Sequence, residues 1–172
     1  MKKISLVIGF VGVLSVFMVS SVGALSKTQE AAISDHCEAV REDLKKVQRA
    51  DARARVYVGG RYETILTDFV TPLNLWLVEK NMSKSEMIES QNAISDAKLK
   101  FSNDYVDYQQ GLEQLVAMDC KGQASAFYDK LVRVRQKRKK VEQDMKDMAK
   151  VLEEYKKRVG KLKEVVNEKA QQ

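Results

Sequence analysis

Cys37 and Cys120 are the two cysteines of this chain, and its one histidine, His36, stands directly before Cys37. A thiol beside an imidazole can serve as a nucleophile with its base, and both side chains can bind zinc. However, adjacent residues of a helix do not face each other, which places His36 beside the apolar seam and in solvent. No activating environment marks Cys37, and these spacings match no recognised zinc ligand set. The pattern therefore favours a structural crosslink over a catalytic, metal or cofactor site.

A disulfide between the cysteines follows if two helices fold back on each other near residue 82. Cys37 then lies 45 residues before the turn and Cys120 lies 38 residues after it. The difference of seven residues is about 10 Å along a helix, which a proline, a glycine pair and the turn can absorb. An exported chain with two cysteines favours one disulfide. It would close a loop of about 84 residues, worth about 4 kcal/mol in the chain-entropy model.

The first 24 residues have the three parts of a secretory signal peptide. Lys2 and Lys3 give a basic start, an apolar run covers residues 4–19, and Val22 and Ala24 have the spacing of a cleavage site. Cleavage after Ala24 leaves residues 25–172 as one domain of ordinary size. The alternative is an uncleaved anchor, because residues 4–25 carry no charge and about 20 apolar residues span a bilayer.

The C-terminal third has the clearest periodicity, which predicts a helix over about residues 123–168. Alternate steps of four and three residues reach apolar side chains at every position except Arg138, for which an exposed or snorkelling side chain is the simplest account. A seam of period 3.5 sustained in this way is typical of a coiled coil. The apolar positions are Phe127, Leu131, Val134, Val141, Met145, Met148, Leu152, Tyr155, Val159, Leu162 and Val166.

The middle segment predicts a second helix over about residues 83–119. Ser83 and Glu86 match a capping box at its start. The seam that follows is weaker, because polar Gln91 and Lys98 interrupt it. We expect the helix to stop near Cys120, because Gly122 can adopt the left-handed conformation that ends helices. The aromatic residues assigned to the core are Phe69, Phe101, Tyr105 and Tyr108, and Trp76 is expected to pack as well.

The first segment predicts one long helix over about residues 28–79, with its own seam interrupted by Asp51. Gly59 and Gly60 weaken it, and Thr71–Pro72 should kink it. The alternative is two helices split at the glycine pair. Short turns near 81–83 and 120–123 force neighbouring helices to be antiparallel. The expected fold is all-α: an elongated antiparallel three-helix bundle, or coiled coil, after the signal peptide.

Charge is unevenly distributed in this chain, whose net charge is +6. From residue 130 onward, cations outnumber anions by about two to one. The densest cluster is a candidate contact for an anionic envelope polymer, lipid head groups or an acidic client; the alternative is a solvated helix face. No nucleic acid is expected, since no zinc finger, basic zipper or aromatic stacking platform is present. The cluster consists of Arg133, Arg135, Lys137, Arg138, Lys139 and Lys140.

Residues 51–79, with Cys37 before them, resemble a class of uncharacterised exported helical proteins of candidate-phylum bacteria. The resemblance rests on the cysteine helix, on arginines at 53 and 55, on Tyr62-Glu63 and on the run 72–74, Pro-Leu-Asn. It implies export and helicity and no particular chemistry. The size, basic charge, signal and helical hairpin are also similar to the periplasmic chaperone family related to the outer-membrane-protein holdase Skp. This chain lacks that family's short strands, so the likeness is one of architecture.

These observations favour an exported, non-enzymatic helical bundle that acts through protein–protein or cell-envelope contacts. One alternative is a periplasmic holdase chaperone that is similar to Skp. Another is a membrane-tethered coiled coil, should residues 4–25 be retained, and an enzyme with an unrecognised site is a third. Association between copies through residues 127–166 is also expected to be feasible. The location would be periplasmic, on the cell surface or secreted.

Overall fold

The computed structural model describes residues 25–82 and 85–170, with side chains up to residue 168. All regular structure in this part of the chain is helical, which confirms the all-α prediction there. The signal or anchor predicted over residues 1–24 and the capping box that starts at residue 83 lie outside the described residues. The elements are α1 (Lys27–Asp35), α2 (Cys37–Ile65), the π-helical η1 (Leu66–Val70), α3 (Thr71–Glu79), α4 (Ser85–Ala117) and α5 (Ala124–Ala170).

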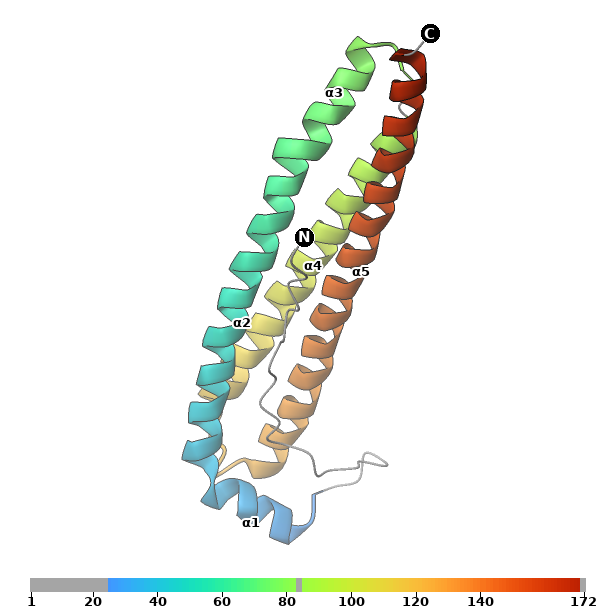
Figure 1. The fold of residues 1–172 in the computed structure, drawn as a ribbon. Helices are drawn as coiled ribbons and strands as arrows, with labels where there is room; N and C mark the ends of the chain where they lie inside the picture. Colours follow the sequence, from blue (N-terminus) through green and yellow to red (C-terminus); the bar gives the residue numbers. More distant parts are fainter. Residues whose placement is uncertain (1–24, 83–84, 171–172) are drawn as a thin grey trace, which may run out of the picture.

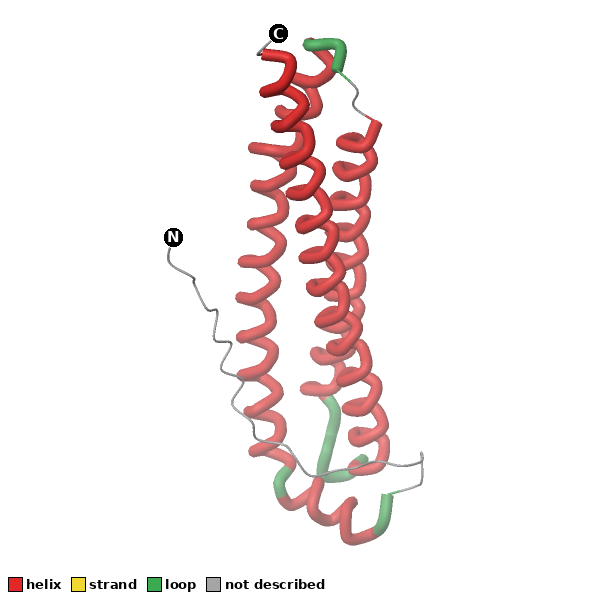
Figure 2. The backbone as a smooth tube through the Cα atoms, turned by 45° about the vertical axis from the view of Figure 1, so that its right-hand side comes forward, coloured by secondary structure: helices red, strands yellow, loops and turns green. Residues whose placement is uncertain are grey.

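The elements are arranged as long rods that lie side by side. Helix α2, η1 and α3 follow one another in a nearly continuous rod, here called the N-terminal rod (Figure 1). Helix α4 returns alongside it, and α5 runs back again, so that successive rods are antiparallel (Figures 1 and 2). The short α1 turns across the end where α5 begins, and it contacts α5.

The apolar core lies chiefly between α4 and α5. The seam predicted in α5 faces this core. From Phe127 to Tyr155 every second seam position is buried, and the alternate positions, polar Arg138 among them, are half-buried. This alternation is what a seam of period 3.5 produces when one neighbour covers it more fully than another. The buried apolar residues of these helices are Met87, Ile94, Phe101, Tyr105, Tyr108, Leu112 and Leu115 on α4, and Phe127, Val134, Val141, Met148 and Tyr155 on α5.

The first predicted helix, 28–79, has one interruption that was not expected, at His36, and a change of helix type at the site of the expected kink. Gly59 and Gly60 lie inside α2 without a break, so the split at the glycine pair is wrong. The chain instead bends at His36, whose φ of −101° and ψ of 11° are not helical. The π-helical η1 precedes Pro72, which lacks the N–H that would bond the carbonyl of residue 68; Pro72 itself lies in the first turn of α3, where that N–H is not required. The expected kink thus takes the form of a π-helical turn.

The start of α1 carries a capping box that sequence analysis missed. The Ser26 hydroxyl accepts a hydrogen bond from the Gln29 N–H at 3.3 Å, and the Ser26 N–H donates to Gln29 Oε1 at 2.9 Å. Each side chain satisfies a backbone donor that the first turn leaves unpaired. The Ser-x-x-Gln spacing was the available signal.

The turn between α4 and α5 differs from the prediction in its mechanism. Gly122 does not have a positive φ, and the one described residue that does is Asn81, with φ of 51° in the other turn. The Asp119 carboxylate instead accepts from the N–H groups of Lys121 and Gly122, both at 3.1 Å, and so closes the turn. A Cβ at position 122 would lie 2.5 Å from Asp119 Oδ2, so a larger residue there would displace the carboxylate that closes the turn.

Candidate functional site

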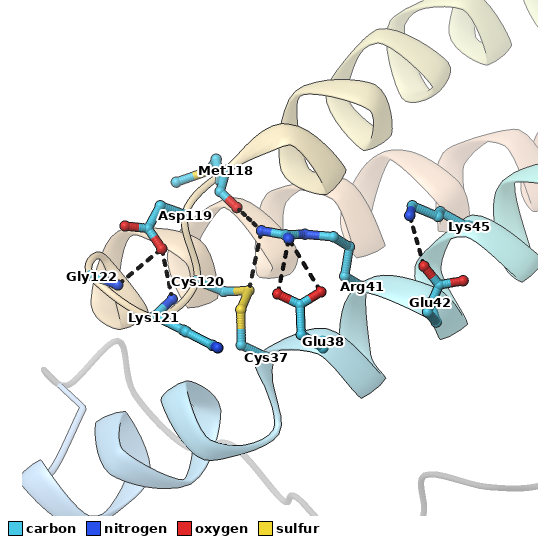
Figure 3. A network of polar contacts seen from close by, with 10 residues as sticks. All are labelled: Cys37, Glu38, Arg41, Glu42, Lys45, Met118, Asp119, Cys120, Lys121 and Gly122. Atoms are coloured by element: carbon cyan, nitrogen blue, oxygen red, sulfur yellow. Dashed lines mark hydrogen bonds and ion pairs between the residues drawn. A yellow bond between two sulfur atoms is a disulfide. The ribbon is translucent and has the colours of Figure 1, made fainter.

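The cysteines meet at the end of the molecule where α4 leads into α5. Cys37 begins α2 and Cys120 lies in the turn after α4, and their Cα atoms are 5.5 Å apart (Figure 3). The two sulfur atoms are at disulfide-bonding distance, and both residues are buried. The predicted pairing of these cysteines is therefore supported by the geometry. With its sulfur bonded to Cys120, Cys37 is not a free nucleophile, and His36 is exposed beside it.

Arg41 links the start of α2 to the residues that follow α4, next to the disulfide. Its guanidinium donates to the Met118 carbonyl at 2.9 Å and to Glu38 at 3.2 Å, and lies 3.9 Å from the sulfur of Cys120 (Figure 3). The carbonyls of a helix end lack partners within the helix, and a cation near them is favourable. Arg41 therefore connects the N-terminal rod to the last turn of α4 beside the covalent bond.

A polar cluster connects all three rods near the middle of the molecule. Asp51 on α2 accepts from the Tyr108 hydroxyl of α4 at 2.7 Å. The same carboxylate accepts from Arg138 of α5 at 2.7 and 3.0 Å. Asp51 and Arg138 are the residues that interrupted the first and last seams. The account of Arg138 as an exposed or snorkelling side chain is therefore wrong, because it is half-buried and ion-paired.

Electrostatics fix the protonation of this cluster. Burial, together with the hydrogen bond to Asp51, raises the pKa of Tyr108. The hydrogen bond to Asp51 likewise raises the pKa of Arg138, against the effect of burial. Tyr108 therefore remains a hydrogen-bond donor and Arg138 remains a cation. Since both donors bind one carboxylate, the cluster is suited to holding three helices together, and it offers no free base for catalysis.

The other polar interruptions of the seams are also paired across helices. Gln91 of α4 accepts from Asn74 of α3 at 2.6 Å and donates to Thr71 at 3.3 Å. Lys98 of α4 forms an ion pair with Glu63 of α2. In the sequence, each of these residues interrupts the apolar seam of its own helix, and the sequence does not reveal its partner on another helix.

A second charged cluster lies between α4 and α5. Asp144 is only 2% exposed and forms an ion pair with Lys100, and Asp104 accepts from Lys140 at 2.7 Å. A shallow depression of about 360 Å³ lies beside them, and its lining includes Leu99. Both lysines are thus already occupied by carboxylates, which leaves little cationic character for binding a small anion in the depression.

Burial raises the pKa of Asp144, which Lys100 only partly offsets. Asp104 is partly desolvated, yet its pKa is lowered because Lys140, Asp144 and Lys100 hydrogen-bond to it. One oxygen of Asp144, Oδ2, has no hydrogen-bond partner among the described residues. Of the two carboxyls, Asp144 is therefore the one that more readily holds a proton.

The predicted basic cluster on α5 divides into two groups. Lys137 bonds Asp107 at 2.6 Å, and Arg138 and Lys140 are paired as described above. The other three side chains are exposed and form no ion pair with the described residues. They are Arg133, Arg135 and Lys139.

An apolar patch on η1 and α3 was not anticipated. Phe69 is 62% exposed and Trp76 is 37% exposed, so their assignments to core and packing positions are wrong. Residues 69–78 are apolar on more than one side of the helix, and only one side can face α4, where Val70 and Leu77 are buried. This excess of apolar residues was a signal in the sequence. The apolar patch comprises Phe69, Pro72, Leu75, Trp76 and Val78.

Within residues 25–82 and 85–170, no three His, Cys, Asp or Glu residues gather as a potential metal site. None of the helices described is both long enough and apolar enough to cross a bilayer. Comparisons with protein-family models, curated proteins and solved structures gave no significant match.

Proposed function

We propose that this chain is an exported, non-enzymatic helical protein that acts by binding other proteins or components of the cell envelope. In this proposal residues 1–24 direct export, and residues 25–172 form an elongated antiparallel three-helix bundle that presents binding surfaces. The observation that carries it is the apolar patch on η1 and α3. The proposal accounts for exposed side chains that the internal packing of the chain does not use.

The apolar patch differs from scattered surface hydrophobics because its members are neighbours on one short segment. Single exposed apolar residues are normal, whereas contiguous ones mark sites of contact with a protein or another apolar surface. The opposite side of α3 is held by Asn74, which donates to the Met87 carbonyl at 3.3 Å and to Gln91. The patch is therefore fixed in orientation before it meets a partner, which lowers the entropic cost of binding.

A photo-crosslinking residue at position 75 tests this proposal in the native host. Leu75 is 60% exposed within the patch, and Val56, which is 71% exposed on α2, provides the matched control position. We expect discrete protein adducts from position 75 that are absent from position 56. Equal labelling from both positions would contradict the proposal, as would purified protein that hydrolyses an envelope substrate and loses this activity through one point mutation.

A periplasmic holdase is the second candidate, and the coexistence of the apolar patch with exposed cations on α5 favours it. Such a protein would keep unfolded envelope proteins from aggregating at low salt. F69S/L75S should then reduce the protection, whereas V56S/L99S should not, because Val56 and Leu99 are equally exposed but lie on α2 and α4. A native protein that gives no protection would remove this candidate.

Three remaining proposals concern the ends and the long helix. Retention of residues 4–25, visible as the intact mass of the native protein, would make it a membrane-tethered coiled coil. Self-association through residues 127–166 would use half-buried seam residues such as Met145 and Leu152, and light scattering at two concentrations tests it. Contact with an anionic partner would use the exposed members of the basic cluster, chiefly Arg133, Arg135 and Lys139.

A further inference from the structure

The outer face of α5 carries a line of cations that extends well beyond the predicted basic cluster. Its members recur in alternate steps of four and seven residues, so that the pattern repeats every eleven residues. All six side chains are exposed. The cationic line consists of Arg135, Lys139, Lys146, Lys150, Lys157 and Lys161.

The eleven-residue repeat makes this line nearly straight. Eleven residues are almost three whole turns, so equivalent positions drift by only about 20° around the helix. At about 1.5 Å per residue, the line from Arg135 to Lys161 is about 39 Å long. The buried seam of Phe127, Val134 and Val141 lies on the opposite side of the helix, so the cationic line faces away from the core.

Most of the acidic groups near these cations are already paired. Lys150 pairs with Asp147 at 3.3 Å and Lys157 with Glu154 at 2.6 Å. Both pairs are exposed and lie within α5, and such pairs contribute little to stability, so a denser anion can replace them. Arg135, Lys139, Lys146 and Lys161 form no ion pair with the described residues. Glu142, Glu153 and Glu164 lie on the same face with the same eleven-residue spacing. Glu142 is bonded to Arg138 at 3.3 Å and Glu153 to Lys156 at 2.6 Å, so two of the three are already paired with cations outside the line.

We propose that the cationic line binds an extended polymer that carries a phosphate group in each repeat, laid along the axis of α5. The cations form a single row along the helix axis, and an extended polyanion presents its charges in a row of the same shape. Closely spaced phosphates can supply a partner to each flexible side chain, and binding then releases the counterions condensed on the polymer. This inference rests on the anionic-contact part of the proposed function and names the partner for it.

Other anionic partners fit this face less well. A membrane-surface helix places large apolar residues beside its cations, yet Val165 is the one exposed large apolar residue in the described part of α5. Binding of single-stranded nucleic acid uses exposed aromatic platforms. On α5, Tyr155 is buried and Tyr128 is half-buried. A backbone of repeated phosphates satisfies the cations without either feature.

The test measures binding of the full chain to labelled long-chain inorganic polyphosphate at several salt concentrations. K139Q/K146Q/K150Q removes three charges from the cationic line. K27Q/K46Q/K80Q removes three exposed charges from other elements and is the matched control. We expect the first variant to bind about 10 to 100 times more weakly, with the slope of log affinity against log salt reduced by about two. The control should stay within about threefold of the native protein, and circular dichroism should show both variants folded.

The other possible outcomes show whether the anionic-contact proposal fails or only the assignment to a phosphate polymer on the cationic line. If the native protein binds no polyanion at low salt, the anionic-contact proposal and this inference both fail. If both variants bind equally weakly, the protein contacts anions through its overall charge and the cationic line is not the site. Equal affinity for polyglutamate of matched length would overturn the assignment to phosphate. Equal affinity for anionic phosphatidylglycerol vesicles, or for tripolyphosphate, would overturn the assignment to an extended polymer.

Discussion

The α4–α5 pair and the N-terminal rod are held by different kinds of interaction. Helix α4 buries nine of its 33 residues, whereas α2 buries two of its 29. The pair is joined by a continuous apolar seam. The rod buries fewer apolar residues, among them Tyr62, Val70 and Leu77. It is also attached at separate polar and covalent points: the disulfide, the Asp51 cluster, the ion pair of Glu63 with Lys98, and the hydrogen bonds of Asn74.

The two kinds of interaction have different roles: apolar burial holds helices together, and polar contacts fix their relative positions. Burial of apolar surface is favourable but non-directional, so a seam alone tolerates sliding by a heptad. Hydrogen-bonded and charged contacts require particular partners, and a shifted helix would leave polar groups unpaired. We infer that the pair supplies most of the stability, whereas the polar points fix where the rod lies along it.

Loss of the disulfide should have the largest effect. C37S/C120S should lower the free energy of unfolding by about 4 kcal/mol, since the bridge closes a loop of 83 residues in separation. Hydrogen exchange should accelerate more in α2 than in α4 or α5, because α2 has few buried residues to replace the bridge. Uniform acceleration across all helices would contradict the contrast between pair and rod.

Matched isoleucines compare the two regions directly. I94A, in the core of α4 at 1% exposure, should cost about 3 kcal/mol in urea unfolding, through lost burial and a residual cavity. I65A removes the same atoms from a half-buried position at the end of α2 and should cost about 1 kcal/mol. Similar losses in the two variants would show that the rod is packed as firmly as the pair.

A double-mutant cycle sharpens the role of the Asp51 cluster. D51A, R138A and the double variant should give a coupling energy of about 1–2 kcal/mol, reduced by salt, because the two side chains are 18% and 30% exposed. The exposed pair of Asp43 and Lys46 is the control and should couple by less than about 0.5 kcal/mol. Equal coupling energies in the two cycles would show that the pair of Asp51 and Arg138 contributes no more to stability than a surface ion pair.

The smallest effect concerns Asp144, the buried carboxylate within the described part of the pair, which interacts with Lys100 and Asp104. Because burial raises its pKa, its contribution to stability is complete below the ordinary aspartate pKa of about 3.9 and is lost as pH rises through its folded-state pKa. D144N does not titrate, so its stability relative to the native protein should increase from pH 3.5 to pH 7. D147N is the control and should change in the opposite direction, because Asp147 is partly exposed and hydrogen bonds from Gln143 and Lys150 lower its pKa. A relative stability of D144N that falls over this range would show that the pair with Lys100 outweighs burial.

Sequence reasoning succeeded where a single chain segment contains the whole signal. The period of 3.5 from Phe127 to Val166 identified the buried face of α5, and the two cysteines identified their own partner. It failed where the cause lies on another helix. Arg138, Gln91 and Lys98 were read as defects, because a one-dimensional pattern does not show that Asp51, Asn74 and Glu63 lie opposite them.

The prediction for the residues of the apolar patch failed for a different reason. Phe69 and Trp76 were assigned to packed positions from an apolar run at helical spacing, yet they lie on the side of the helix that no other described rod covers. Gly122 was expected to end a helix through its backbone freedom, whereas what it provides is room for the carboxylate of Asp119. In both cases the sequence shows the residue types and their spacing. It does not show which other residue or helix lies next to them.

The disulfide also divides the chain by its response to mechanical tension. Pulling on the two ends would transmit force across the sulfur bridge and bypass α2, α3 and α4, which lie within the covalent loop. Helices α1 and α5 lie outside the loop and would unravel first. The 47 residues of α5 would lengthen from about 70 Å as a helix to about 160 Å when extended. Under reducing conditions the separation of 83 residues would add a second extension of about 280 Å. Under oxidising conditions, tension would therefore extend only α1 and α5 among the described helices, and the loop closed by the disulfide would not lengthen.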